Sequence, residues 1–84
     1  MSFRDHAMKA RVKGALLSDP LTRKCVIQVR ASHGTVFLRG TVTRAEVALH
    51  AQQLALNVTG VDVVLTRLTW QDGATRNSLR YFHR

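Results

Sequence analysis

The acidic and nucleophilic residues of this chain are too scattered to form a catalytic centre. The 84-residue sequence has five Asp and Glu residues, and four of them, Asp5, Asp19, Glu46 and Asp62, stand at or near the ends of predicted helices and strands. Acid–base catalysis typically uses paired carboxylates, and nucleophilic catalysis a Ser, His and Asp on a shared face; nucleotide binding typically uses a glycine-rich loop. The sequence shows none of these patterns, so it predicts no enzymatic activity and no cofactor.

Cysteine and histidine predict no metal site. Cys25 is the only cysteine, which excludes an internal disulfide and a cysteine-rich metal site. It starts a predicted strand, where we expect a small buried hydrophobic residue rather than a reactive thiol. His33 lies in a short turn over residues 32–34, and no second His, Cys or carboxylate stands at a metal-ligand spacing from it.

Basic residues supply the chemistry that remains. Thirteen Lys and Arg against five Asp and Glu give a net charge of +8, which favours an anionic partner: a phospholipid surface, a nucleic acid or an acidic protein. One arginine from each of three predicted strands faces outward beside two apolar side chains; the group is Arg30, Arg39, Arg67, Phe37 and Leu65. Guanidinium groups pair bidentately with phosphate, so this face suits lipid head groups.

A solvated sheet face is the alternative interpretation of this group, and it accounts for the arginines better than for Phe37 and Leu65. A second cationic group consists of Lys9 and Lys13, which form a ridge with His6 on the flank of the first predicted helix. That ridge either binds an anionic partner or is a solvated helix face whose long side chains cover apolar surface.

Five predicted elements position these residues. Apolar residues at helical spacing predict a first helix over 3–17, which ends because Asp19 precedes a proline. Period-2 alternation predicts strands over 25–31, 35–42 and 61–70, the first two joined as an antiparallel hairpin, with a second helix before the last strand. The order predicts an α+β fold: a single αββαβ two-layer sandwich with two helices packed on one face of a three-stranded sheet.

The second helix is expected to begin at a capping box and to end at a glycine. Thr43 stands three residues before Glu46, so its hydroxyl and the carboxylate can each accept a backbone N–H. Gly60 then provides the C-terminal turn of the helix. Gly40 lets the preceding strand bend or approach a helix closely.

The last residues, 71–84, show no clear period and contain Asp72 next to Gly73. We interpret them as a mobile or loosely docked tail that follows a domain of residues 1–70. The end of this tail interleaves aromatic and cationic residues, a composition that suits a membrane interface or a nucleic acid. Docking on the uncovered sheet face is an equally good interpretation.

Small and apolar residues recur in a fixed order from the first helix to the last strand: Val12, Ala15, Leu16, Leu17 and Asp19; Ile27 and Val29; Val36, Leu38, Gly40 and Val42; Ala48, Ala51, Leu54, Ala55 and Val58; Gly60, Val61, Val64 and Leu68. This succession resembles the BON domain, a small module named from bacterial osmotic-shock and nodulation proteins. The resemblance implies an α/β sandwich of the order predicted above, no enzymatic activity, and a role in binding phospholipid or supporting membranes. Gly40 and Gly60 fall on the family's glycines.

We therefore expect a non-enzymatic BON-type module whose partner is an anionic phospholipid surface. The alternative is protein interaction or self-association. It would use either Leu49 and Leu56, which lie opposite the core-facing arc of the second helix, or the uncovered sheet face. Specific nucleic-acid binding is disfavoured, because RNA-binding sheets stack two or three bases on aromatic side chains and this face offers Phe37 alone.

The sequence has no run approaching the roughly 20 apolar residues of a membrane span and no N-terminal signal of the secretory type. From the sequence as it stands we expect a cytoplasmic protein. If it is the mature fragment of an exported protein, we expect a periplasmic one.

Overall fold

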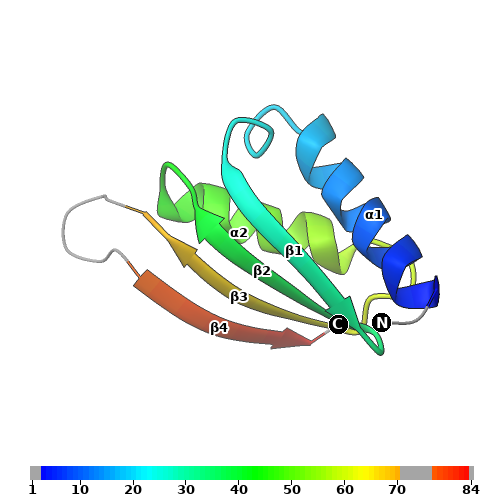
Figure 1. Cartoon of the computed structure of the whole chain (residues 1–84). Helices are drawn as coiled ribbons and strands as arrows, with labels where there is room; N and C mark the ends of the chain where they lie inside the picture. The colour runs from blue at the N-terminus through cyan, green and yellow to red at the C-terminus, as the bar shows by residue number, and fades with distance from the viewer. Residues whose placement is uncertain (1–2, 71–76, 84) are drawn as a thin grey trace.

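The structure is a computed structural model that describes residues 3–70 and 77–83. Within these ranges, two helices and four strands follow one another (Figure 1): α1 (Phe3–Ser18), β1 (Val26–Ser32), β2 (Thr35–Thr41), α2 (Ala45–Leu56), β3 (Val63–Thr69) and β4 (Asn77–His83). The predicted α+β order over the first five elements is confirmed, with boundaries within two residues for α1, β1 and β3.

The strands form one mixed sheet in the order β1-β2-β3-β4. β1 and β2 pair as the predicted antiparallel hairpin, β2 and β3 pair in parallel, and α2 makes the crossover between them. The turn between β1 and β2 has positive φ at both His33 and Gly34, the backbone that a tight hairpin of right-twisted strands favours. Asp5 of α1 is buried and accepts the His33 N–H at 3.0 Å, which ties the helix to this turn.

A fourth strand extends the predicted three-stranded sheet. β4 pairs antiparallel with β3 along its whole length, from Thr69 opposite Asn77 to Val63 opposite His83. The sequence analysis assigned residues 71–84 to a mobile or loosely docked tail; residues 77–83 are instead a strand of the sheet. The other residues of that segment, 71–76 and 84, lie outside the described part of the chain.

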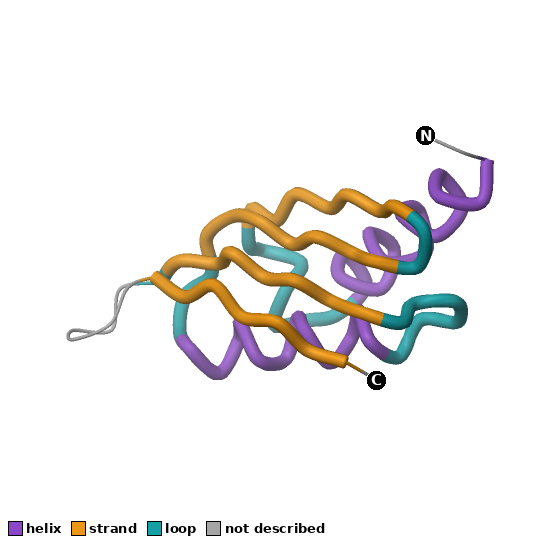
Figure 2. The backbone as a smooth tube through the Cα atoms, turned by 90° about the horizontal axis from the view of Figure 1, so that it is seen from below, coloured by secondary structure: helices purple, strands orange, loops and turns teal. Residues whose placement is uncertain are grey.

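Both helices cover the same face of the sheet, as predicted, and the strands lie in front of them when the molecule is seen from below (Figure 2). α1 packs on β1, α2 packs on β3, and the two helices pack on each other. The core fills the space between the layers with side chains such as Met8, Val12, Leu16, Leu38, Val47, Ala51, Val64 and Leu68, all at most 4 % exposed. Each large apolar side chain buried in this way contributes about 1.5–3 kcal/mol.

α2 buries a wider arc than its predicted core-facing side, because it packs on α1 as well as on the sheet. Gln52 and Leu56 are buried together with Val47, Ala51 and Ala55, an arc that covers roughly half of the helix circumference. Leu49 lies just outside this arc at 50 % exposure, whereas Leu56 is only 9 % exposed. The predicted interaction ridge of Leu49 and Leu56 is therefore wrong.

The predicted capping box at the start of α2 is also wrong. The N-cap residue is Arg44, in an extended conformation, and its side chain makes no capping hydrogen bond. The Arg44 carbonyl accepts the N–H of Val47 at 3.1 Å, while the Glu46 carboxylate lies 3.7 Å from the Arg44 guanidinium. Because the helix begins one residue later than the capping box requires, Thr43 is outside the N-cap position.

Two glycines have roles that differ from those predicted. α2 ends at Leu56 with Asn57 as its C-cap, so Gly60, at φ +95°, belongs instead to the turn in which Val61 donates to the Val58 carbonyl at 3.2 Å. Gly40 does allow a close approach, but by β1 rather than by a helix. At φ +148°, a Cβ on Gly40 would overlap the Val26 carbonyl oxygen.

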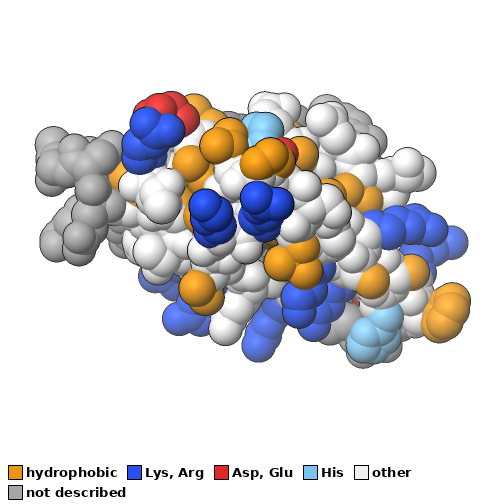
Figure 3. Space-filling view, turned by 90° about the horizontal axis from the view of Figure 1, so that it is seen from above, with side chains coloured by type: hydrophobic (Ala, Val, Ile, Leu, Met, Phe, Trp, Pro, Cys, Tyr) orange, Lys and Arg blue, Asp and Glu red, His pale blue; other side chains and the backbone are white. Residues whose placement is uncertain are grey.

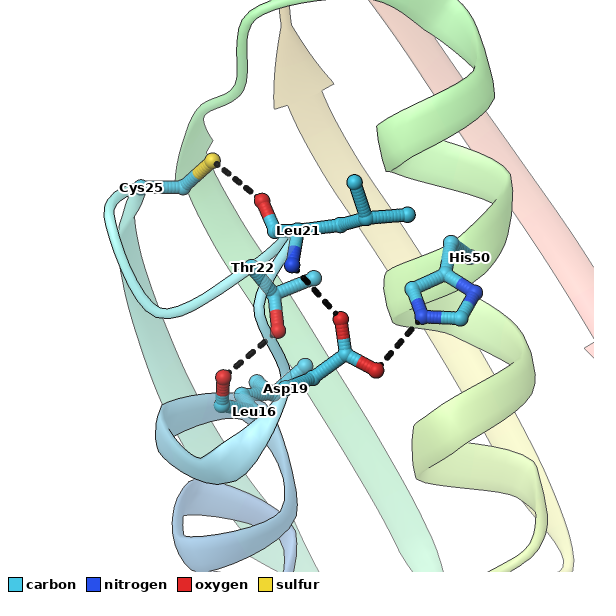
Figure 4. Close-up of polar contacts among 6 residues, drawn as sticks. All are labelled: Leu16, Asp19, Leu21, Thr22, Cys25 and His50. Atoms are coloured by element: carbon cyan, nitrogen blue, oxygen red, sulfur yellow. Dashed lines mark hydrogen bonds and ion pairs between the residues drawn. The ribbon is translucent and has the colours of Figure 1, made fainter.

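A polar cluster holds the connection after α1 against α2 (Figure 4). One Asp19 carboxylate oxygen lies 2.7 Å from Nε2 of His50, and the other accepts the Leu21 N–H at 2.8 Å. The hydrogen bond with His50 lowers the pKa of Asp19 below its ordinary value of 3.8. The buried Thr22 hydroxyl donates to the Leu16 carbonyl at 2.5 Å and so satisfies one of the last carbonyls of α1.

Candidate anion-binding face

The sheet face opposite the helices brings together five of the predicted site residues. The register places Gln28, Arg39 and Arg67 side by side across β1, β2 and β3. The next row on the same face contains Arg30, Phe37 and Leu65. Side chains alternate between the two faces of a strand, and the inward neighbours Val29, Leu38 and Leu68 are buried. We call these six outward residues the arginine face.

The arginine face is hollowed where β1 and β2 meet. A hollow of about 290 Å³ is lined by Gln28, Arg30, Phe37 and Arg39. Phe37 is 41 % exposed despite its size, Leu65 beside it is half-buried and Arg67 is exposed. Gln28 was not among the predicted site residues, although the alternation of β1 places it on the same face as Arg30.

The arginines of this face have no ion-pair partner among the described residues. The ion pairs in this part of the chain are Arg44 with Glu46 and His50 with Asp19, both away from the sheet. All acidic residues in the described ranges, Asp5, Asp19, Glu46 and Asp62, lie outside the strands. Arg39 stands directly opposite Arg67, and like charges in such a pair are mutually destabilising.

The cations of α1 are not part of the arginine face. Lys9 and Lys13 lie on α1, which packs on the other side of the sheet. Lys13 is exposed and Lys9 is half-buried beside the core residue Met8. Figure 3 shows the molecule from the side opposite to that of Figure 2, and on this side Lys and Arg side chains are spread among hydrophobic ones. The predicted anion-binding residues thus form two separate surfaces.

A second, smaller hollow lies between α2 and β3, and the sequence did not predict it. Its volume is about 80 Å³, and its lining includes Leu49, Gln52, Thr66 and Trp70. Trp70 is 6 % exposed, and its indole N–H is buried without a hydrogen-bond partner among the described residues. The period-2 alternation of residues 61–70 places Trp70 on the same face as Val64 and Leu68, but nothing in the sequence indicates that Gln52 on α2 is buried near it.

No group of three or more His, Cys, Asp or Glu side chains within residues 3–70 is arranged to hold a metal ion. Cys25, expected as a buried residue, is half-buried, and its thiol lies 3.6 Å from the Leu21 carbonyl oxygen.

The order of elements and the placement of the small residues agree with one known family. Residues 4–72 match the pattern that defines the BON domain, which is most of the chain. The protein belongs to the BON domain family. BON domains are non-catalytic binding modules, which fits the absence of catalytic groupings in the sequence. No curated protein resembles this BON domain closely enough to count as a relative. Neither helix of the described chain is long and apolar enough to span a bilayer.

Proposed function

We propose that this BON domain binds anionic phospholipid membranes through the arginine face. The observation that supports this proposal is the set of three arginines around Phe37 and Leu65, which have no ion-pair partner within residues 3–70. They lie on the sheet face opposite α1 and α2. A solvated face explains exposed arginines, but it gives no reason for an aromatic ring at its centre. Arginine also suits this contact because it is weakly hydrated and binds phosphate with two parallel hydrogen bonds.

The contact combines charge with shallow apolar insertion. A Lys or Arg near an anionic membrane surface contributes about 1 kcal/mol, so the three arginines together supply roughly 3 kcal/mol, or about two orders of magnitude in affinity. Phe37 and Leu65 would enter the head-group layer between them. The net charge of +8 adds attraction at long range and raises the rate of encounter.

Vesicle flotation tests this function. Wild type should float with vesicles that contain phosphatidylglycerol and remain behind with phosphatidylcholine vesicles. Changing Arg30, Arg39 and Arg67 to Gln should reduce binding about a hundredfold at 0.15 M salt, in line with about 1 kcal/mol for each cation. A matched control changes Arg11, Arg23 and Lys24 to Gln; these residues are exposed cations outside the sheet face.

Equal losses in the two triple variants would mean that net charge alone matters, and would contradict a role for the arginine face. Binding that survives both variants but is lost in Phe3→Ser and Leu17→Ser, which are exposed on α1, would move the contact to that helix. Binding to neither kind of vesicle at low salt would overturn the lipid proposal. We do not propose association through Leu49 and Leu56, because Leu56 is buried.

A further inference from the structure

The three arginines of the arginine face are close enough to bind one ligand group together. Neighbouring strands of a sheet lie about 5 Å apart, and diagonal neighbours across an antiparallel pair are about 7–8 Å apart. Arg39 is opposed to Arg67, and Arg30 is diagonal to Arg39 because its own opposite residue is Phe37. An arginine stem spans a comparable distance, so all three guanidinium groups can converge over Phe37.

Such a site favours a ligand with more than one negative charge. The like-charged pair of Arg39 and Arg67 gains most from an anion that neutralises both residues, and no carboxylate of the described strands does so. A phosphomonoester carries a charge of about −1.5 to −2 at pH 7 and presents three acceptor oxygens. A phosphodiester, as in most membrane lipids, carries a single charge and has two free oxygens.

The hollow between β1 and β2 supplies the remaining features. Its volume of about 290 Å³ is larger than a phosphate group alone, so there is room for the group that carries the phosphate. Gln28 can donate through its amide, Arg30 and Arg39 provide the charge, and Phe37 forms an apolar wall. These residues lie opposite one another on two paired strands, so the site is built on rigid elements rather than on loops.

From this geometry we infer that the arginine face selects a terminal phosphate, that is, a phosphomonoester, over a phosphodiester of the same surface charge. The inference rests on the proposed function for its membrane form, in which the ligand is a lipid whose head group is a phosphomonoester. A soluble phosphomonoester would present the same chemistry.

The test uses the full chain and two kinds of phosphatidylcholine vesicle, one with phosphatidic acid and one with phosphatidylglycerol adjusted to the same surface potential. We expect about tenfold tighter binding to phosphatidic acid at pH 7.5, which corresponds to one additional charge-assisted hydrogen bond. The preference should disappear near pH 5, where the phosphomonoester is singly charged because its second pKa is about 6.

Arginine-to-lysine variants separate the geometry of the site from its charge. Arg39→Lys with Arg67→Lys keeps the net charge but removes the guanidinium forks, so the ratio of affinities for phosphatidic acid and phosphatidylglycerol vesicles should fall to about one. The control Arg11→Lys with Arg23→Lys changes exposed residues outside the sheet and should keep the preference. Circular dichroism verifies that both variants are folded.

Equal binding of wild type to both vesicles overturns the phosphomonoester inference and leaves the proposed function intact, whereas binding to neither overturns both. Glycerol 3-phosphate distinguishes the source of the ligand. If it displaces the protein from phosphatidic acid vesicles and glycerophosphocholine at equal ionic strength does not, the inference holds with a soluble ligand. If neither compound displaces the protein, the inference holds with a lipid ligand.

Discussion

At the scale of single residues, Gly40 is the position where one added methyl group should damage the sheet most. A Cβ there would overlap the Val26 carbonyl oxygen and lie 3.1 Å from the Ile27 Cα, and both are backbone atoms of the paired strand. The φ of +148° is also one that L side chains rarely adopt. We expect Gly40→Ala to lower the free energy of unfolding by about 3 kcal/mol or more, measured by urea denaturation.

Two other glycines serve as controls for this effect. A Cβ on Gly60 would meet nothing within 4 Å, although its φ is +95°. Gly60→Ala should therefore lower the free energy of unfolding only by the cost of backbone strain, about 1–2 kcal/mol. Gly14 is within α1 and is equally open, so Gly14→Ala should gain about 1 kcal/mol from helix propensity. If Gly40→Ala were as mild as Gly60→Ala, the close approach of β1 would be refuted.

Asp19 should control part of the acid stability of the domain. Its pKa is lowered chiefly by the hydrogen bond with His50, so the native state favours the ionised carboxylate. The resulting stability is fully present above the unfolded pKa of 3.8 and is lost as the pH falls through the lower native pKa. In Asp19→Asn, the melting temperature should therefore fall less steeply between pH 5 and pH 2 than in wild type.

Thermal melts followed by circular dichroism across this pH range provide the measurement. Glu46→Gln is a suitable control, because the Glu46 side chain is 74 % exposed and its carboxylate forms a long ion pair with the Arg44 guanidinium, at 3.7 Å. An unchanged acid slope in Asp19→Asn would show that the contact between α2 and the end of α1 contributes nothing to acid stability.

At the scale of elements, a better N-cap residue at the start of α2 should stabilise the domain. Arg44 occupies the N-cap without a side-chain hydrogen bond, whereas Ser or Asp there would accept a backbone N–H. Arg44→Ser should raise the free energy of unfolding by about 1 kcal/mol, since the exposed pair with Glu46 is worth little. Thr43→Ala should change it by less than about 0.5 kcal/mol, as for other surface substitutions. Urea denaturation measures both variants. If Thr43→Ala lowered the free energy of unfolding by about 1 kcal/mol, the result would support a capping box at Thr43 and Glu46.

The sequence predicted elements well where the signal is a local period, and poorly where distant contacts decide. The alternation of β1, β2 and β3 correctly placed Arg30, Arg39, Arg67, Phe37 and Leu65 on one face. The burial of Leu56 could not be read from α2 alone, because it depends on a second helix packing beside the first. β4 depends on pairing with the open edge of β3. Its alternation covers only residues 78–81 and is interrupted at Phe82, which is too short to indicate a strand by itself.

At the scale of the whole molecule, the two cationic surfaces cannot touch one flat membrane together. The arginine face and α1 lie on opposite layers, and the shortest dimension of the fold is 20 Å. At 0.15 M salt charges are screened beyond about 8 Å, whereas at 0.01 M they act over about 30 Å. A domain that binds through the arginine face therefore holds Lys9 and Lys13 outside the range of the membrane charge at physiological salt.

This geometry predicts that Lys9→Gln with Lys13→Gln changes binding to anionic vesicles less than about twofold at 0.15 M salt, where screening isolates the two layers. At 0.01 M salt the same variant should lose several-fold in affinity, because both layers then feel the membrane. The double change Arg39→Gln with Arg67→Gln is the matched comparison and should weaken binding strongly at both salt concentrations. Flotation across a salt series measures all three proteins. If the lysine variant lost more than the arginine variant at 0.15 M salt, the domain would be oriented with α1 toward the membrane and the arginine face toward solvent.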